Sequence, residues 1–351
     1  MSRPLRVIQI GICHEHANGK IETLRALKDD YEVVGFVDDR ASTAPRWPLM
    51  RPATYWDGIP TLTLDEALAL PDLDAAFVEV TNAELVGVAE RVLARGLPMH
   101  MDKPGGETYA PFERLRTGAK ARGLPFQMGY MFRGNPAVQW LIHAVRAGWF
   151  GDVFEVEADM DHNYGDDDYR RYLGSFRGGI LYNLGCHLAD IVVAMLGEPV
   201  AARPSILTAP GSPPDSRDNC SATLEFASGA LAHIRSCGRL PTGTARRRLR
   251  VCGTRGMAEL CPIEHFNNLP LTLDVRFAHG DAGIPANRWQ TLDFGPQGSY
   301  GNVDRYSAQL REFARQVRGE EAEPDTLCEH DLAVQRTVLK MCGLEVTSAS
   351  R

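Results

Sequence analysis

Residues 5–17 read Leu-Arg-Val-Ile-Gln-Ile-Gly-Ile-Cys-His-Glu-His-Ala, and this stretch decides the fold. Leu5–Ile10 predicts a strand, Gly11 a turn, and the run beyond it, with Ile21 and Leu24 among its apolar positions, predicts a helix. The same alternation continues to residue 128, which predicts a doubly wound α/β domain with a parallel sheet. Further strands are expected at 32–37, 75–80, 98–101 and 125–128, and further helices at 64–70, 85–95 and 110–122.

The pattern of predicted helices and strands changes after residue 128. Asn135-Pro136 predicts a helix start, residues 161–177 are polar and predict a loop, and residues 181–196 predict a long helix. Several short apolar strands then follow between turn residues, as in an antiparallel meander. Since 351 residues exceed what one core holds, we expect two domains, an α/β domain at 1–128 and an α+β domain with a large, mostly antiparallel sheet at 129–351.

Composition excludes several classes of protein. The net charge is −7, which gives no support for nucleic-acid binding, and no run of 18 apolar residues predicts a membrane span. The start of the chain shows no signal peptide and the eight cysteines are scattered, so we expect reduced thiols in the cytoplasm. The basic run 246–250 is interpreted as a solvated hairpin edge, with a phosphate-binding patch as the alternative.

The turn after the first strand stands where a dinucleotide-binding chain carries Gly-x-Gly-x-x-Gly. Only Gly11 matches, because Cys13 and His16 replace the second and third glycines. One residue favours a dinucleotide site. Asp38 follows the second strand, where a carboxylate binds ribose hydroxyls and repels a 2′-phosphate. That position favours NAD over NADP, a preference that Arg40 partly reverses. The alternative for Asp38 is an ordinary turn residue.

His14 and His16 have the spacing of a metal-binding pair, yet no cluster of Cys, His or acidic residues accompanies them in the sequence. We therefore predict no metal site. The two histidines are expected to pack at the start of the helix or to face the phosphates of a ligand.

Residues 99–104 read Met-His-Met-Asp-Lys-Pro and place Lys103 just after a predicted strand. The carboxyl edge of an open α/β sheet is where ligands bind. A lysine at that edge serves in proton transfer if burial or a nearby positive charge lowers its pKa. The alternative is a solvated Lys-Pro turn.

Residues 178–190 read Gly-Gly-Ile-Leu-Tyr-Asn-Leu-Gly-Cys-His-Leu-Ala-Asp. In a helix, Asn183, His187 and Asp190 lie on one face, because they are separated by four and three residues. That face would present an amide, an imidazole and a carboxylate to a polyol. The alternative is a core histidine whose hydrogen bonds are satisfied within the protein.

Together these stretches resemble the Gfo/Idh/MocA family of NAD(P)-dependent sugar and polyol oxidoreductases. Its Glu-Lys-Pro motif is similar to Asp102-Lys103-Pro104, and its Gly-Gly-x-x-x-Asp-x-Gly-x-His motif is similar to residues 178–187. Its Tyr-Arg-x-Asn-Pro segment is similar to residues 132–136. The resemblance covers nearly the whole chain and implies a Rossmann domain followed by an α+β domain that forms homodimers or homotetramers. The chain departs from the family in its degraded glycine turn, in Asp102 for glutamate, and in Asn183 for a catalytic aspartate.

The resemblance implies roles for individual residues. Lys103 would orient the substrate hydroxyl and share in proton transfer, and His187 would be the general acid/base, whereas Asn183 can hydrogen-bond but cannot take a proton. The residues expected at the substrate are Asn183, Tyr182, Asp161, His162, Tyr164 and Arg133, although a solvated loop remains the alternative for those at 161–164. The residues expected at the cofactor are Gly11, Ile12, Cys13, His14, His16, Asp38, Arg40, Thr81, Asn82, Asp102 and Lys103.

The sequence thus predicts an NAD-dependent dehydrogenase that oxidises a secondary alcohol of a sugar, glycoside or cyclitol by hydride transfer. One alternative is a glycosidase or lyase in which bound NAD is reduced and reoxidised within each cycle. Another is a sugar-sensing regulator without catalysis, which the degraded glycine turn and Asn183 favour. The expected partner is a small carbohydrate or polyol, with no nucleic acid and no membrane.

Overall fold

The structure is a computed structural model that describes residues 3–48, 51–163, 165–265, 269–280, 283–296, 302–324 and 326–348. Its contacts divide the chain into two compact units. Unit 1 comprises Met1–Met131, Asn302–Leu332 and Val346–Arg351, and unit 2 comprises Phe132–Gly301 and Ala333–Glu345. The first stretch of unit 1 runs three residues beyond the boundary expected at 128, and two C-terminal segments are added to it.

Unit 1 is built on a six-stranded parallel sheet with the order β3-β2-β1-β4-β5-β6. This is the doubly wound order, and its topological switch point lies between β1 and β4, where such sheets bind ligands at the carboxyl ends of the strands. The doubly wound fold is therefore confirmed. The strands are β1 Leu5–Ile10, β2 Tyr31–Val37, β3 Thr61–Leu62, β4 Ala75–Val78, β5 Met99–Met101 and β6 Phe126–Met128.

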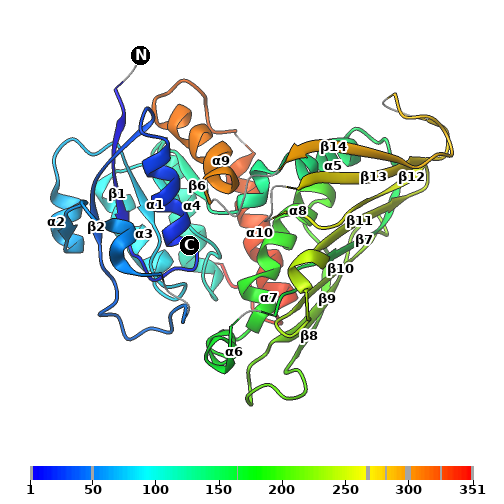
Figure 1. Cartoon of the computed structure of the whole chain (residues 1–351), viewed down its shortest axis with the longest axis horizontal. Helices are drawn as coiled ribbons and strands as arrows, with labels where there is room; N and C mark the ends of the chain where they lie inside the picture. Colours follow the sequence, from blue (N-terminus) through cyan, green and yellow to red (C-terminus); the bar gives the residue numbers. More distant parts are fainter. Residues whose placement is uncertain are drawn as a thin grey trace. The chain divides into compact units, whose positions relative to one another are not determined.

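Helices connect these strands, and one helix from the far end of the sequence joins them (Figure 1). Helix α3 ends at Gly96, which adopts the left-handed conformation expected of a glycine after a helix. Helix α9 contacts α1, and Gln309 on α9 exchanges hydrogen bonds with β6 through Gln127 and Met128. The helices of this unit are α1 Ala17–Ala26, η1 Ala53–Trp56, α2 Leu64–Ala69, α3 Leu85–Arg95, α4 Tyr109–Ala121, α9 Asn302–Val317 and the start of α10 Leu327–Met341.

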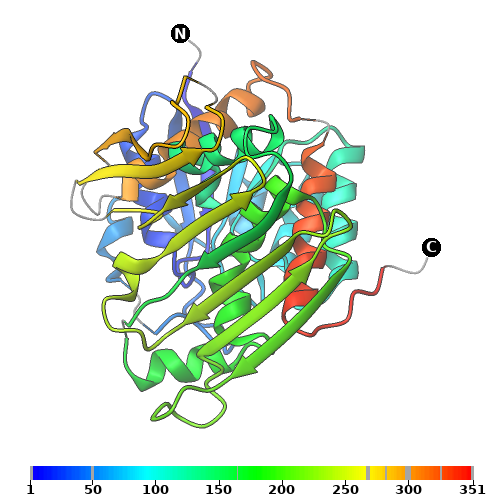
Figure 2. The same cartoon turned by 90° about the vertical axis from the view of Figure 1, so that its right-hand side faces the viewer.

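Unit 2 holds an eight-stranded sheet with the order β14-β13-β12-β11-β7-β10-β9-β8 (Figure 2). All its pairs are antiparallel except β7 with β10, which is parallel. The mostly antiparallel sheet is thus confirmed, although a simple meander is not. The strands are β7 Val153–Asp159, β8 Ala201–Leu207, β9 Asn219–Glu225, β10 Leu231–Cys237, β11 Arg248–Gly253, β12 Gly256–Leu260, β13 Pro270–Phe277 and β14 Gln290–Pro296.

The helices of unit 2 correct two sequence predictions. The expected loop at 161–177 contains α6, because Asp166 caps it by accepting from the backbone N–H groups of Asp168 and Tyr169. The long helix expected at 181–196 is interrupted at Leu184 and forms α7 and α8. The bounds are η2 Met131–Gly134, α5 Pro136–Arg146, α6 Asp167–Gly174, α7 Gly179–Asn183, α8 Gly185–Leu196 and η3 Gly243–Arg246.

The basic run at 246–250 is not a hairpin edge, which corrects a third prediction. Strand β11 lies inside the sheet, between β12 and β7. Arg248 pairs with Glu157 and Asp159 on β7, and Arg250 pairs with Glu157 and Glu155. These arginines therefore bind acidic side chains on the neighbouring strand and are not a phosphate-binding patch.

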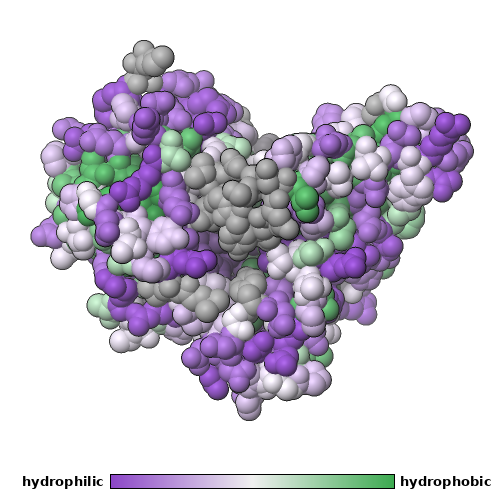
Figure 3. Space-filling view, in the orientation of Figure 1, coloured by the Kyte–Doolittle hydropathy of each residue, from purple (hydrophilic) through white to green (hydrophobic). Residues whose placement is uncertain are grey.

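The face of the molecule that Figure 3 shows carries both hydrophilic and apolar residues. Hydrophilic residues prevail on the face shown in Figure 3, and apolar residues form smaller patches between them. Among the described residues, no helix combines the length and the apolar composition that crossing a membrane requires.

A buried histidine lies inside the parallel sheet of unit 1. His100 on β5 accepts a hydrogen bond from the ammonium of Lys20 at 2.6 Å through Nε2 and donates through Nδ1 to Gln127 at 2.9 Å. Both ring nitrogens are satisfied only while the imidazole is neutral. Burial, followed by the charge of Lys20, lowers the pKa of His100 to about 3.

This pKa predicts that acid destabilises unit 1. Between pH 6.5 and about 3, His100 carries a proton in the unfolded chain but not in the folded one, so stability falls as the pH falls through this window. His100 accounts for a loss of about 1.4 kcal/mol of unfolding free energy for each pH unit within this window. We expect His100→Gln to lower the stability at pH 7 but to flatten its fall between pH 7 and 4.5, measured by urea unfolding. Equal slopes in the two proteins would contradict this account.

Candidate functional site

The turn between β1 and α1 begins with a glycine that the fold requires. Gly11 has φ +101°, and a Cβ there would lie 2.4 Å from the backbone nitrogen of Val80, which follows β4. The backbone N–H groups of the next three residues already donate hydrogen bonds within the protein. The N–H groups of Ile12 and Cys13 donate to the carboxylate of Asp39 at 2.8 and 3.0 Å, and that of His14 donates to the carbonyl of Glu79 at 3.1 Å.

The two aspartates after β2 therefore have different roles. Asp39 faces the turn, and burial raises its pKa as well as that of the neighbouring Cys13 thiol. Asp38, the predicted ribose ligand, is paired instead with Arg40, whose Nε lies 3.0 and 2.9 Å from its two carboxylate oxygens. The hydrogen bonds from Arg40 lower the pKa of Asp38, which keeps it charged. Asp39 is a residue that sequence reasoning missed.

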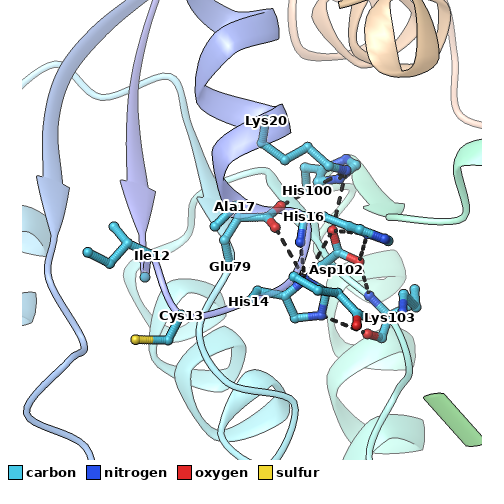
Figure 4. A network of polar contacts seen from close by, with 12 residues as sticks. Ile12, Cys13, His14, His16, Ala17, Lys20, Glu79, His100, Asp102 and Lys103 are labelled. Atoms are coloured by element: carbon cyan, nitrogen blue, oxygen red, sulfur yellow. Dashed lines mark hydrogen bonds and ion pairs between the residues drawn. The ribbon is translucent and has the colours of Figure 1, made fainter. Parts of the chain in front are cut away.

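Asp102 is fully buried just beyond β5 and collects donors from three directions (Figure 4). Its oxygens accept from His16 Nδ1 at 3.1 and 3.2 Å and from the Lys103 backbone N–H at 2.7 Å. The ammonium of Lys20 on α1 lies 3.5 Å away. Burial opposes the charge of Asp102, but His16, His14 and Lys20 together hold its pKa well below the ordinary value.

His14 and His16 are both buried and neutral. A carbonyl can only accept, so His14 donates from Nε2 to the Lys103 carbonyl at 3.2 Å, and its Nδ1 accepts from the His16 backbone N–H at 3.2 Å. Burial lowers the pKa of His14, and it lowers that of His16 to about 4. Glu79, beside them, has a raised pKa because of burial and the neighbouring charge of Asp102.

The structure supplies the acid that the His-x-His pair lacks in sequence. Ligand-type atoms of His14, His16 and Asp102 lie within 4.8 Å of one another. However, both nitrogens of His14 already make hydrogen bonds, and the Lys20 ammonium contributes positive charge beside Asp102. A cation would therefore have to displace contacts that satisfy this cluster. The absence of a metal stays a prediction.

Lys103 is the buried cation at the carboxyl edge of the parallel sheet. Its side chain is fully buried, and its ammonium forms an ion pair with the carboxylate of Glu15 from the β1–α1 turn. Burial opposes the charge of Glu15, but Lys103 holds its pKa below the ordinary value. The alternative of a solvated Lys-Pro turn is wrong, because a solvated lysine would be exposed.

Two predicted cofactor residues follow β4. Thr81 donates from its hydroxyl to Glu84 at 3.0 Å. Asn82 is buried, and neither the nitrogen nor the oxygen of its amide has a hydrogen-bond partner among the described residues. Burying an amide without hydrogen-bond partners lowers the stability of the fold unless a ligand supplies those partners. Asn82 and the close approach at Gly11 fit a dinucleotide at this edge, whereas the engaged amides of Ile12 and Cys13 do not offer a pyrophosphate the usual donors.

In unit 2, the Gly-Gly stretch serves close packing. Gly179 has φ +54°, and a Cβ there would lie 2.2 Å from the carbonyl oxygen of Arg217. Asn183 ends α7 and His187 lies in the first turn of α8, both buried, with the His187 ring 5.6 Å from the ring of Phe132. Asp190 binds Arg133, whose Nη2 lies 2.6 Å from its carboxylate. Arg133, a predicted substrate ligand, is thus already paired with an acid of its own unit.

The remaining predicted substrate residues that the structure describes are buried. Asp161 and His162 are 2% and 0% exposed, so the alternative of a solvated loop is wrong for both. Asp161 pairs with Arg235, and His162 contacts the hydroxyl of Tyr169 through Nε2 at 2.9 Å. Burial raises the pKa of Asp161 and lowers that of His162. Tyr182 is buried against Phe176, and Tyr164 lies outside the described residues.

The structure therefore brings together four predicted residues of unit 1, namely His14, His16, Asp102 and Lys103. It adds Glu15, Lys20 and Glu79, which sequence reasoning missed. The sequence did contain a sign of Glu15, because this residue lies between the two histidines that were predicted to contact the ligand. The signals for Lys20 and Glu79 were absent, because a charged residue on a helix or after a strand is ordinarily exposed.

Comparison with known proteins finds a family profile that matches part of unit 2. The profile of the GFO/IDH/MocA C-terminal domain matches residues 138–259. The rhizopine catabolism protein MocA of Rhizobium meliloti is 26% identical over 207 residues, which is 58% of this chain and 64% of that protein. The chain spans less than two thirds of the length of the curated relatives it matches, between 40% and 64%.

Solved structures share the fold over nearly the whole chain. An oxidoreductase from Agrobacterium radiobacter, in complex with NAD+, L-tartaric acid and magnesium, has 16% identity and a TM-score of 0.75 over 95% of this chain and 94% of that one. The aldose-aldose oxidoreductase from Caulobacter crescentus, complexed with glycerol, has 23% identity and a TM-score of 0.73 over 97% and 98%. The family profile on residues 138–259 and the curated relatives agree with the motifs of the sequence, and the solved structures share the two-unit fold.

Proposed function

We propose that this chain is an NAD-dependent dehydrogenase that oxidises a secondary alcohol of a sugar, glycoside or cyclitol. The observation that carries the proposal is the buried ammonium of Lys103, held by Glu15 at the carboxyl edge of the doubly wound sheet. A buried charge is costly, so a protein keeps one at a ligand-binding edge for a reason beyond stability. The solved relatives that were crystallised with NAD or glycerol support this class of ligand.

We propose that two residues named by the sequence motifs carry the proton chemistry. Lys103 contacts the substrate oxygen, and His187 takes the proton from the hydroxyl as general base. Asn183, at the end of α7, donates or accepts a hydrogen bond without exchanging a proton. A bound nicotinamide would supply the acceptor for the hydride. Gly11, Asn82 and Asp38 are the residues of unit 1 proposed to hold the dinucleotide.

Replacing either proton-handling residue should cost activity. We expect Lys103→Ala and His187→Ala to lower kcat by about 10²–10⁴-fold, the usual range for general acid–base groups. The measurement is NADH formation over a panel of sugars and polyols, on the substrate that the wild-type protein uses best. Lys120→Ala, at a half-exposed lysine that pairs with Glu329, is the matched control. Wild-type turnover in either single variant would refute the assignment.

The choice between NAD and NADP is proposed to depend on Asp38. Its carboxylate would repel a 2′-phosphate, and its loss would release Arg40 to bind one. We expect Asp38→Ser to shift the ratio of kcat/KM for NADP to that for NAD by about tenfold or more, which corresponds to about 1.4 kcal/mol. Asp65→Ser, which removes another carboxylate paired with an arginine, should leave the ratio unchanged. An unchanged ratio in Asp38→Ser would exclude this role.

A sugar-binding protein without catalysis is the second candidate, and the engaged amides of Ile12 and Cys13 favour it. The two candidates differ in whether a dinucleotide binds. We expect denatured protein to release NAD, identified by its ultraviolet spectrum and mass, or the native protein to bind added NAD in calorimetry. Sugar binding without either result would favour the sensor. NAD that copurifies while product forms without net NADH would favour the redox-neutral glycosidase or lyase. Homo-oligomer formation and a cytoplasmic location stay predictions.

A further inference from the structure

Three consecutive residues of the β1–α1 turn contact the Asp102-Lys103 dipeptide. His14 donates to the Lys103 carbonyl at 3.2 Å, Glu15 pairs with the Lys103 ammonium, and His16 donates to the Asp102 carboxylate at 3.1 Å (Figure 4). In a glycine-rich turn, these positions approach the phosphates of a dinucleotide. In this chain, their side chains bind the protein's own strand end.

The middle contact is an almost completely buried pair of opposite charges. The Lys103 side chain is 0% exposed and the Glu15 side chain 6% exposed. In such a position, removing one partner takes an opposite charge away from the other buried group, which disfavours the ionised form of that group. The charge state of Lys103 and the direction of its ammonium therefore depend on Glu15.

We propose that Glu15 is a positioning residue that keeps Lys103 charged and aims it as a hydrogen-bond donor toward the substrate oxygen. The inference rests on the proposed function and refines it. A charged lysine cannot accept the proton of the hydroxyl, so that proton leaves to another base, for which His187 is the candidate. Lys103 stabilises the negative charge that develops on the oxygen.

The first test needs no enzymatic activity. The chain has five lysines, at 20, 28, 103, 120 and 340, so protein labelled with ¹³C at the lysine ε-carbon gives a short spectrum, assigned with single Lys→Arg variants. We expect Glu15→Gln to move the titration of the Lys103 resonance to lower pH. Glu198→Gln removes the carboxylate that binds Lys340 at 2.8 Å and is the matched control. It should leave the titration of the Lys103 resonance unchanged.

The outcome decides the inference independently of the proposed reaction. If the Lys103 resonance titrates in Glu15→Gln as it does in Glu198→Gln, the inference is overturned, whatever the protein catalyses. If Glu15→Gln does not fold, Glu15→Asp provides the comparison, because it keeps the charge but shortens the side chain. We then expect the Lys103 titration to shift in the same direction by a smaller amount, and an unshifted titration would overturn the inference.

The second test separates positioning from a general loss of structure. We expect Glu15→Gln to lower kcat by about 100-fold, the scale of a misplaced catalytic group, with little change in KM for NAD. The alkaline limb of its kcat–pH profile should move to lower pH, and Glu15→Asp should restore part of kcat. A wild-type profile in Glu15→Gln would overturn the inference. If the wild-type protein shows no NAD-dependent turnover, the proposed function fails. The lysine titration still decides whether Glu15 keeps Lys103 charged.

Discussion

The carboxylate of Asp102 is the interaction on which the site of unit 1 depends. It lies fully buried beyond β5, where an unpaired charge would cost several kcal/mol. Three groups compensate it, the His16 imidazole, the Lys103 backbone N–H and the Lys20 ammonium. Because these donors come from the β1–α1 turn, from α1 and from the strand end itself, one charge fixes the relative positions of all three. Lys103, the next residue, is held in place as a consequence.

The same constraint explains why the turn departs from the glycine fingerprint. Glycines would let a pyrophosphate approach the backbone, but they could not reach Asp102 or Lys103. Histidines at positions 14 and 16 reach both, and the neutral imidazole suits a buried site because one ring nitrogen donates a hydrogen bond and the other can accept one. The loss of the glycine at position 16 is therefore matched by a contact of His16 with the buried Asp102 carboxylate, and His14, between the two glycine positions, adds a contact with Lys103.

Much of the fold could be predicted from local sequence. Strand β1 and helix α3, with Gly96 after it, have the predicted bounds because alternation, helical periodicity and a terminal glycine are properties of neighbouring residues. Helix α6 was missed because its acidic start resembles a loop, although Asp166 is its cap. The parallel pairing of β7 with β10 and the contact of His16 with Asp102 join residues far apart in sequence. No local pattern encodes such a contact.

In unit 2, too, the local sequence pattern does not predict which partner a polar side chain binds. Helical spacing places Asn183, His187 and Asp190 on one face, which suggests that all three meet a ligand. In the structure, Asp190 neutralises Arg133 through a forked ion pair, as expected for a buried carboxylate with an arginine within reach. The pair satisfies both charges within unit 2. The chemistry proposed for this unit therefore falls to His187, with Asn183 as a hydrogen-bonding neighbour that cannot compete for the proton.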